Sequence, residues 1–264
     1  MNRAKNLRRN LLECPTERFR APLFKPNDTW PGRLENSVRR FLDLQAGSIW
    51  KDLKPELAQA SGIVLDVGCG AQVYKGLISR EAAYQGIDTH EAKAHFGYDT
   101  PDATYFEGDE WPVADGSVDC VLCTEVLEHI PDSLLFLRRI QGCLRPGGRL
   151  LLTVPFAARW HFVPHDYWRF TPSGLGRLLV LAGFSDVVVR ARGNPLTVAC
   201  YKVMALPLML LFGDPPARAS RLLRQLTGVF LSPFLVLVAF VGNWSLRGDW
   251  GEDCLGYTVT ARRV

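Results

Sequence analysis

The sequence predicts an α/β protein built on a doubly wound parallel sheet. The apolar run 64–67 leads straight into a glycine-rich turn, as a buried parallel strand does at its end. Short apolar segments then alternate with helical periodicity as far as residue 192. The chain of 264 residues is long enough to bury a full core, so we expect one α/β domain with an elaboration.

The turn at residues 64–71 organises this prediction. Gly68 and Gly70 let the backbone turn sharply and approach a ligand without a Cβ atom in the way. We expect a helix over residues 73–80, whose first N–H groups would face the same ligand. The dinucleotide fingerprint requires a third glycine where this chain has Val73, which disfavours a nicotinamide cofactor.

Further strands are predicted along the chain, and the second of them ends at Asp88. That acid lies about 20 residues beyond the glycine turn, where a carboxylate reaches the ribose of a nucleotide. Helices are expected from Pro131 to Leu144 and from the N-cap Thr171 to about Gly183. The predicted strands after the first are 83–87, 104–107, 118–123, 149–154 and 186–190.

The N-terminal segment differs in character from this core. Residues 1–32 read as an irregular basic arm with no apolar region typical of a secretory signal. Helical periodicity begins at Leu34, and Ser48 is predicted to be the N-cap of a second helix. The two helices would cap the ligand cleft or merely cover the sheet edge. The net charge of +4 does not indicate a nucleic-acid partner.

The seven cysteines are odd in number and lie mostly in apolar runs, which indicates buried, reduced thiols in a cytoplasmic protein. Cys120 and Cys123 have the spacing of a redox or zinc motif. They fall in a predicted strand, however, where residues three apart face opposite sides. We therefore expect neither role for them.

A cluster of chemically active side chains lies in residues 156–170, after the fifth strand. His161 and His165 have the i, i+4 spacing of a metal-binding pair, but Pro164 opposes the helix that would align them. We therefore predict no metal site. The sequence favours a hydrogen-bonded loop that overhangs the pocket.

Five motifs in order carry a family resemblance: DVGCG at 66–70, YQGID at 84–88, GSVDCVLC at 116–123, EVLEHI at 125–130 and LRPGG at 144–148. A sixth segment, HDYWRFT at 165–171, follows them. Together they resemble the class I S-adenosylmethionine-dependent methyltransferases, and most closely a small bacterial-type branch. The resemblance covers residues 60–192 and a last strand at 255–261. It implies S-adenosyl-L-methionine as cofactor and a seven-stranded Rossmann-like sheet whose last strand is antiparallel.

The resemblance also implies which residues bind the cofactor. In the family an acid five residues before a proline contacts the adenine amino group, and counting back from Pro112 gives Glu107. Asp109 is the rival, because the usual residue there is aspartate; Glu107 is favoured. The cofactor-binding residues expected are Asp66, Gly68, Cys69, Gly70, Asp88, Glu107, Asp109, Glu125 and Val126.

The expected reaction is methyl transfer to oxygen or nitrogen of a small-molecule or lipid-linked acceptor. The protein would mainly align the acceptor and exclude water, and a hydroxyl acceptor would also need a base. The base candidates are His129, His161 and His165, with Tyr167 and Arg169 as orienting groups. The alternative is a non-catalytic cofactor-binding or assembly protein on the same fold. A dehydrogenase is disfavoured.

An apolar insertion separates the sixth strand from the last. Its segments 195–213 and 225–246 are almost uncharged, and the second is long enough to span a bilayer. The chain must return to the same sheet, and two crossings would carry arginines to the far side, so we expect a shallow hairpin. The insertion would then contact the inner face of the membrane peripherally. Core helices or a homodimer interface are the alternatives.

These patterns divide the chain into four predicted parts: a basic arm and helical cap at 1–60, a cofactor-binding core at 61–192, the insertion at 193–253 and the last strand of the core at 254–264.

Overall fold

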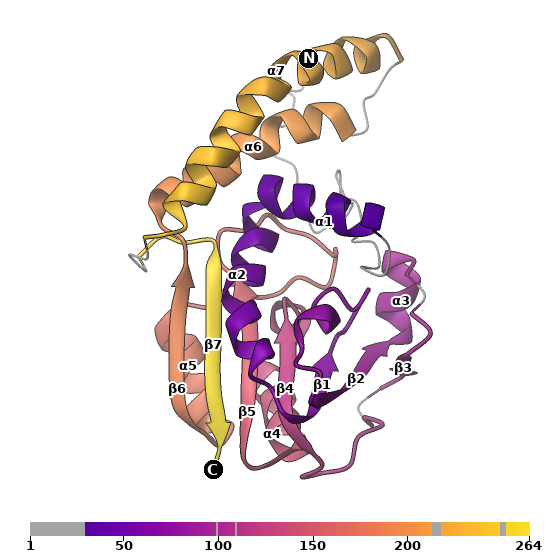
Figure 1. The fold of residues 1–264 in the computed structure, drawn as a ribbon, viewed down its shortest axis with the longest axis vertical. Helices are drawn as coiled ribbons and strands as arrows, with labels where there is room; N and C mark the ends of the chain where they lie inside the picture. Colours follow the sequence, from indigo (N-terminus) through magenta and orange to yellow (C-terminus); the bar gives the residue numbers. More distant parts are fainter. Residues whose placement is uncertain (1–29, 99, 109, 213–217, 249–251) are drawn as a thin grey trace, which may run out of the picture.

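The computed structural model describes residues 30–98, 100–108, 110–212, 218–248 and 252–264. Its centre is a seven-stranded sheet in the order β3-β2-β1-β4-β5-β7-β6 (Figure 1). The first five strands are parallel, whereas β7 is antiparallel to both β5 and β6. This confirms the predicted Rossmann-like sheet with its antiparallel last strand. The strands are β1 (Gly62–Val67), β2 (Ala82–Thr89), β3 (Ala103–Phe106), β4 (Val118–Thr124), β5 (Leu144–Pro155), β6 (Phe184–Arg192) and β7 (Gly256–Arg263).

Helices cover both faces of the sheet. On one face α2 (Leu44–Ala58) buries Leu53 and Leu57 against β1, β4 and β5. On the other face α4 (Ser133–Cys143) and α5 (Pro172–Leu181) complete a larger core. Cys120 belongs to the first core and Cys123 to the second, which confirms that the two thiols face opposite sides of β4.

The N-terminal helices begin at other residues than the sequence predicted. The helix α1 spans Trp30–Leu42, and α2 begins at Leu44 with Asp43 as its N-cap. The Asp43 carboxylate accepts the N–H groups of Gln45 and Ala46 at 3.1 and 3.3 Å. The N-cap assigned to Ser48 was therefore wrong. Its hydroxyl is buried inside the helix and donates to the Gln45 carbonyl at 2.8 Å.

The helix predicted over residues 73–80 was also wrong. Only one 3-10 turn, η1 (Lys75–Leu77), follows the glycine turn, and Ile78 is already extended. The Ser79 N–H then donates to the Leu57 carbonyl of α2 at 3.1 Å. This hydrogen bond fixes the connection to β2 against α2, so the chain does not form a second helical turn. By contrast, the predicted cap of α5 is confirmed, since Thr171 Oγ1 accepts the Gly174 N–H at 3.2 Å.

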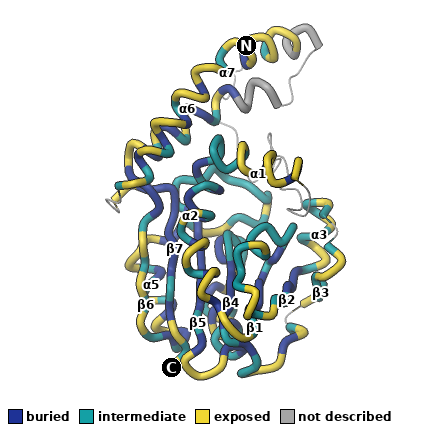
Figure 2. Tube along the Cα trace, viewed as in Figure 1, coloured by how far each residue is buried: buried dark blue, intermediate teal, exposed yellow. Residues whose placement is uncertain are grey.

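The insertion forms a helical hairpin of α6 (Pro195–Phe212) and α7 (Arg218–Ser245). Its base packs on the N-terminal helices through Leu44, Met204 and Ala239. The rest of the hairpin projects beyond the sheet, and most of its outer surface is exposed (Figures 1 and 2). One helix, Leu222–Ser245, is long and apolar enough to cross a membrane. The four-part division of the chain stays a prediction.

Candidate active site

The glycine turn lies where the carboxyl ends of β1, β2 and β4 meet. Gly68 and Gly70 have φ values of 72° and 50°, which side-chain-bearing residues rarely adopt. A Cβ atom on Gly68 would lie 2.4 Å from Val126 Cγ2. The turn is fixed to β2, because the N–H groups of Gly68 and Cys69 both donate to the Ile87 carbonyl. These positions therefore form a narrow backbone cradle.

Asp88 closes one side of this cradle. Its carboxylate is 5 % exposed and accepts the N–H groups of Gly70 and Thr89, each at 2.8 Å. Burial raises the pKa of Asp88, and the two backbone hydrogen bonds oppose that rise. Each carboxylate oxygen accepts more than one hydrogen bond. Asp88 can therefore hold the turn and still accept hydroxyl groups of a nucleoside.

Asp66 lies at the end of β1 beneath the same turn. Its Oδ2 accepts a hydrogen bond from the Tyr84 hydroxyl at 2.8 Å. Its Oδ1 is buried and has no hydrogen-bond partner among the described residues. Burial raises the pKa of Asp66 to about 7. An orphaned buried oxygen beside a backbone cradle fits a ligand that brings a hydrogen-bond donor or a positive charge.

The structure describes one of the two acids predicted to bind adenine. Glu107 follows β3 and is exposed, whereas Asp109 lies outside the described residues. The choice between the two acids stays a prediction.

An aromatic cluster covers the cradle. Tyr98 stacks on Phe96, and its hydroxyl would lie 3.3 Å from a Cβ atom on Gly70. Phe162, from the loop after β5, contacts the Phe96 ring at 4.9 Å between centroids. Phe96 ends α3 (His90–Phe96), so the cluster joins α3 to that loop. Sequence reasoning missed this cover because its members come from segments more than sixty residues apart.

Glu125 has the strained conformation often found at functional sites, with a φ of 54°. Its Oε1 accepts a hydrogen bond from Arg192 Nη2 at 2.9 Å. Arg192 is fully buried and also donates to the Val154 carbonyl and to Ser48 Oγ. The arginine thus ties α2 and β5 to the end of β4. No sequence signal marked it, since it is one arginine near the end of an alternating strand.

The loop after β5 is held by an ion pair between Asp166 and Arg169. Both guanidinium NH2 groups donate to the carboxylate, at 2.6 and 2.8 Å. Burial alone would raise the pKa of Asp166, but Arg169 and the side chain and N–H of His161 hold it well below its usual range. Arg169 is therefore engaged in positioning the loop.

The loop brings His161 next to Glu128 and His129, which follow β4. The Nε2 atoms of His129 and His161 lie 3.6 and 4.0 Å from Glu128 Oε1. Burial and the neighbouring His161 lower the pKa of His129 to about 4. Burial, reinforced by Glu125, raises the pKa of Glu128 well above its ordinary value. Sequence analysis named both histidines as base candidates and placed Glu128 at this end of the sheet within the VLEH motif, but gave it no role.

His165 and Tyr167, also predicted for the site, lie apart from this group. His165 Nε2 is 3.1 Å from Glu91 Oε1, and its Nδ1 is 3.2 Å from the Tyr167 hydroxyl. The His165 side chain is half-buried, and Tyr167 is exposed. Only the backbone carbonyl of His165 reaches inward, where it accepts a hydrogen bond from His129 Nδ1 at 2.7 Å. The structure therefore groups His161 with His129 and separates it from His165.

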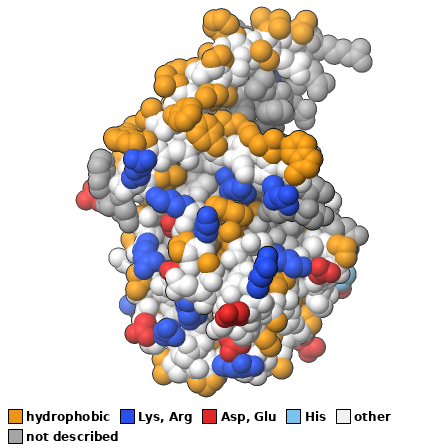
Figure 3. Space-filling view, viewed as in Figure 1, with side chains coloured by type: hydrophobic (Ala, Val, Ile, Leu, Met, Phe, Trp, Pro, Cys, Tyr) orange, Lys and Arg blue, Asp and Glu red, His pale blue; other side chains and the backbone are white. Residues whose placement is uncertain are grey.

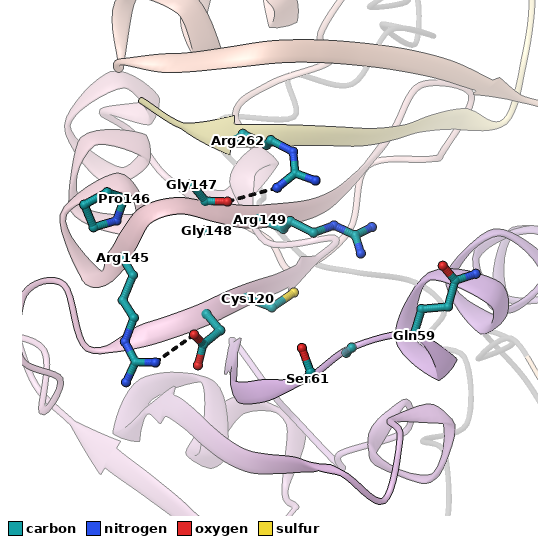
Figure 4. Close-up of a pocket in the computed structure, with 11 residues that line it drawn as sticks. Gln59, Ser61, Cys120, Arg145, Pro146, Gly147, Gly148, Arg149 and Arg262 are labelled. Atoms are coloured by element: carbon teal, nitrogen blue, oxygen red, sulfur yellow. Dashed lines mark hydrogen bonds and ion pairs between the residues drawn. The ribbon is translucent and has the colours of Figure 1, made fainter.

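A hollow of about 270 Å³ lies at the opposite edge of the sheet (Figure 4). Arg145, Arg149 and Arg262 line it, next to the start of β5. Each arginine is engaged, with Asp119, Glu56 and the Gly147 carbonyl respectively. Ligands of open α/β sheets bind outside the carboxyl ends of the strands, so this hollow is not the candidate active site.

Comparison with known proteins agrees with this geometry. Residues 38–188 match the family described as methyltransferase domain. The chain belongs to that family. The cradle, the orphaned Asp66 oxygen and Asp88 fit S-adenosylmethionine as the cofactor of this methyltransferase domain.

Individual relatives of this methyltransferase match over part of their length. It is 30 % identical over 151 residues to the ubiquinone biosynthesis O-methyltransferase of Parvibaculum lavamentivorans, covering 52 % of this chain and 54 % of that one. It is 29 % identical over 146 residues to the Vibrio vulnificus enzyme of that name, covering 45 % and 61 %. The chain thus spans about half of the length of these relatives or slightly more.

A solved methyltransferase structure shares the fold. The SAM-dependent methyltransferase from Archaeoglobus fulgidus superposes with a TM-score of 0.50 and 16 % sequence identity. The match covers 89 % of this chain and all of that one. It supports the assignment of the fold and carries no information on the acceptor.

Proposed function

We propose that this methyltransferase transfers the methyl group of S-adenosylmethionine to an oxygen atom of a small, lipid-linked acceptor at the cytoplasmic face of a membrane. The relatives named O-methyltransferases support oxygen over nitrogen as the acceptor atom. The exposed apolar hairpin of α6 and α7 carries the lipid-linked part of the proposal.

The hairpin exposes large apolar side chains in a contiguous stretch of α7. Phe230 is 83 % exposed, and Leu223, Leu226 and Phe240 are each more than half exposed. Contiguous apolar surface of this kind marks a membrane or protein contact. The hairpin also touches the active-site loop, since Lys202 Nζ donates to the Ala157 carbonyl. A membrane bound by the hairpin would therefore lie close to the active site.

Charge supports a contact from the cytoplasmic side. Basic side chains lie on the body of the molecule below the apolar hairpin (Figure 3). Arg247 directly follows α7 and is exposed, and Lys51 Nζ donates to the Leu246 carbonyl at 2.6 Å. Cations at this level would meet the anionic headgroups of the inner leaflet. Arg218 and Arg221 fall outside the residues whose side chains are described.

The reaction places modest demands on the protein. The cofactor supplies an activated methyl group when bound, so the chain must position the acceptor and keep water away. The aromatic cover of Phe96, Tyr98 and Phe162 serves the second need. His129 and His161 are the proposed proton acceptors for an acceptor hydroxyl when their Nε2 atoms carry no metal ion. His165, Tyr167 and Arg169 are proposed to orient the loop and the acceptor.

Label transfer tests this function. The full-length enzyme is incubated with methyl-tritiated S-adenosylmethionine and either membranes or soluble extract from bacterial cells, and the products are extracted into organic solvent. We expect label in an organic-soluble product from membranes only, which mild alkali or acid treatment then assigns to an ether or ester. Label confined to water-soluble products would contradict the lipid-linked acceptor.

A further inference from the structure

Glu128, His129 and His161 share a geometry that the methyltransferase fold itself does not require. One potential ligand atom from each residue lies within 4.8 Å of those of the other two. Glu128 Oε1 lies 3.6 Å from His129 Nε2 and 4.0 Å from His161 Nε2. Ligands bound about 2.0 to 2.2 Å from one tetrahedral ion stand about 3.3 to 3.6 Å apart. Small side-chain rotations would therefore bring all three atoms onto one cation.

A second observation at this place points to a cation as ligand. The Glu128 side chain is completely buried, and neither of its carboxyl oxygens has a hydrogen-bond partner among the described residues. Buried carboxyl groups are nearly always hydrogen-bonded, paired with a charge or bound to a metal. The two neighbouring imidazoles present nitrogen atoms to Glu128 in the manner of fellow ligands.

The Nδ1 atom of each imidazole, on the side away from Glu128, has a polar partner of the kind found in metal sites. His129 Nδ1 bonds to the His165 carbonyl at 2.7 Å. His161 Nδ1 lies 3.0 Å from the Arg159 carbonyl and 3.2 Å from Asp166 Oδ2. These acceptors favour the Nδ1–H tautomer, which leaves the Nε2 lone pair of each ring free toward Glu128. Ligating histidines are usually oriented by such carbonyl and carboxylate partners.

We propose that Glu128, His129 and His161 bind one divalent transition-metal ion of the zinc, iron or cobalt class. Two imidazoles and one carboxylate suit these ions, whereas magnesium and calcium prefer oxygen ligands. Three protein ligands leave an open position, at which such an ion acts as a Lewis acid on a bound oxygen.

The site adjoins the cofactor cradle, because Val126, two residues before Glu128, faces Gly68. Binding of the ion does not depend on the identity of the acceptor. The metal proposal and the lipid-linked acceptor can therefore fail separately.

Cobalt binding tests the proposal directly. The full-length protein is stripped with chelator and titrated with Co²⁺, while visible absorption and elemental analysis after desalting report the bound ion. We expect one Co²⁺ per chain, displaced by Zn²⁺ and unaffected by an equal concentration of Mg²⁺. Glu128→Gln and His161→Asn should each weaken binding at least about 100-fold, and Asp166→Asn about 10- to 100-fold.

The control is His90→Asn, which removes an exposed histidine at the start of α3 and should bind Co²⁺ as the wild type does. A wild-type protein that retains no cobalt, or folded Glu128→Gln and His161→Asn variants that bind it equally well, would overturn the proposal. Should both variants unfold by circular dichroism, X-ray absorption of the cobalt-loaded wild type decides. Scattering from two imidazoles supports the site, and scattering from fewer contradicts it.

Discussion

Asp66 shows how one residue links the cofactor turn to stability. In the unfolded chain its carboxyl group has the ordinary pKa of 3.8, whereas burial raises the pKa in the folded protein to about 7. Between these values folding takes up a proton. The Asp66 contribution therefore makes the folded state less stable as the pH rises from about 4 to about 7, and adds no further change above that range.

We predict that Asp66→Asn removes this dependence. The variant should match the wild type near pH 3.5 and exceed its free energy of unfolding at pH 8 by up to about 4 kcal/mol, since each pKa unit corresponds to about 1.4 kcal/mol. Urea unfolding of the cofactor-free protein at the two pH values measures the difference. Asp115→Asn, at an exposed acid, is the matched control and should follow the wild type. Identical pH responses of the two variants would mean that Asp66 is ionised throughout.

Residue-level prediction succeeded where one backbone requirement dominates and failed where partners are distant in sequence. The glycines at 68 and 70 could be identified because their turn tolerates no side chain. Arg192 could not, and neither could the burial of Glu128, since their environment comes from strands and loops that only the fold brings together. The contact of His165 with Glu91 of α3 could not be foreseen for the same reason, and the role of His165 stays a prediction.

At the scale of elements, the helices α4 and α5 were predicted correctly from the sequence, whereas the helix at 73–80 and the start of α2 were not. The segment 73–80 has few residues between a fixed turn and β2, so tertiary hydrogen bonds to α2 outweighed its local preference. Asp43 is the N-cap of α2 because its carboxylate accepts the N–H groups of two residues in the first turn. The two apolar segments of the insertion became helices as their composition indicated, but sequence alone could not show that α7 leaves its outer face exposed.

A prediction at this scale concerns membrane binding by the hairpin of α6 and α7. Phe230→Ser with Phe234→Ser should weaken binding to phosphatidylglycerol-containing vesicles at least about tenfold, because each buried aromatic side chain contributes about 1.5 to 3 kcal/mol. Vesicle co-sedimentation measures the change. Val180→Ser with Leu135→Ser, exposed apolar residues on the body of the molecule, is the control pair and should bind normally. Equal binding by both pairs, or a dimer that only the phenylalanine pair dissociates, would contradict a membrane contact.

In the whole molecule, the two ends of the parallel strands differ in their role. The carboxyl edge carries the glycine turn, Asp88, the histidine group and the loop that covers them, and α1 and the hairpin lie at this same end (Figure 1). The opposite edge carries the arginine-lined hollow, whose charges are engaged by the protein itself. The order of the motifs was sufficient to predict this polarity, because parallel strands place all their carboxyl ends together.

The central claim is that the carboxyl edge binds the cofactor. Calorimetric titration of S-adenosylhomocysteine into the wild type, Asp88→Asn and Asp115→Asn tests it most directly. The carboxylate of Asp88 would form charge-assisted hydrogen bonds with ribose hydroxyls, each worth about 1.5 to 3 kcal/mol. We predict at least a tenfold higher Kd for Asp88→Asn and an unchanged Kd for Asp115→Asn. An Asp88→Asn protein that folds and binds the ligand with the wild-type Kd would contradict the claim.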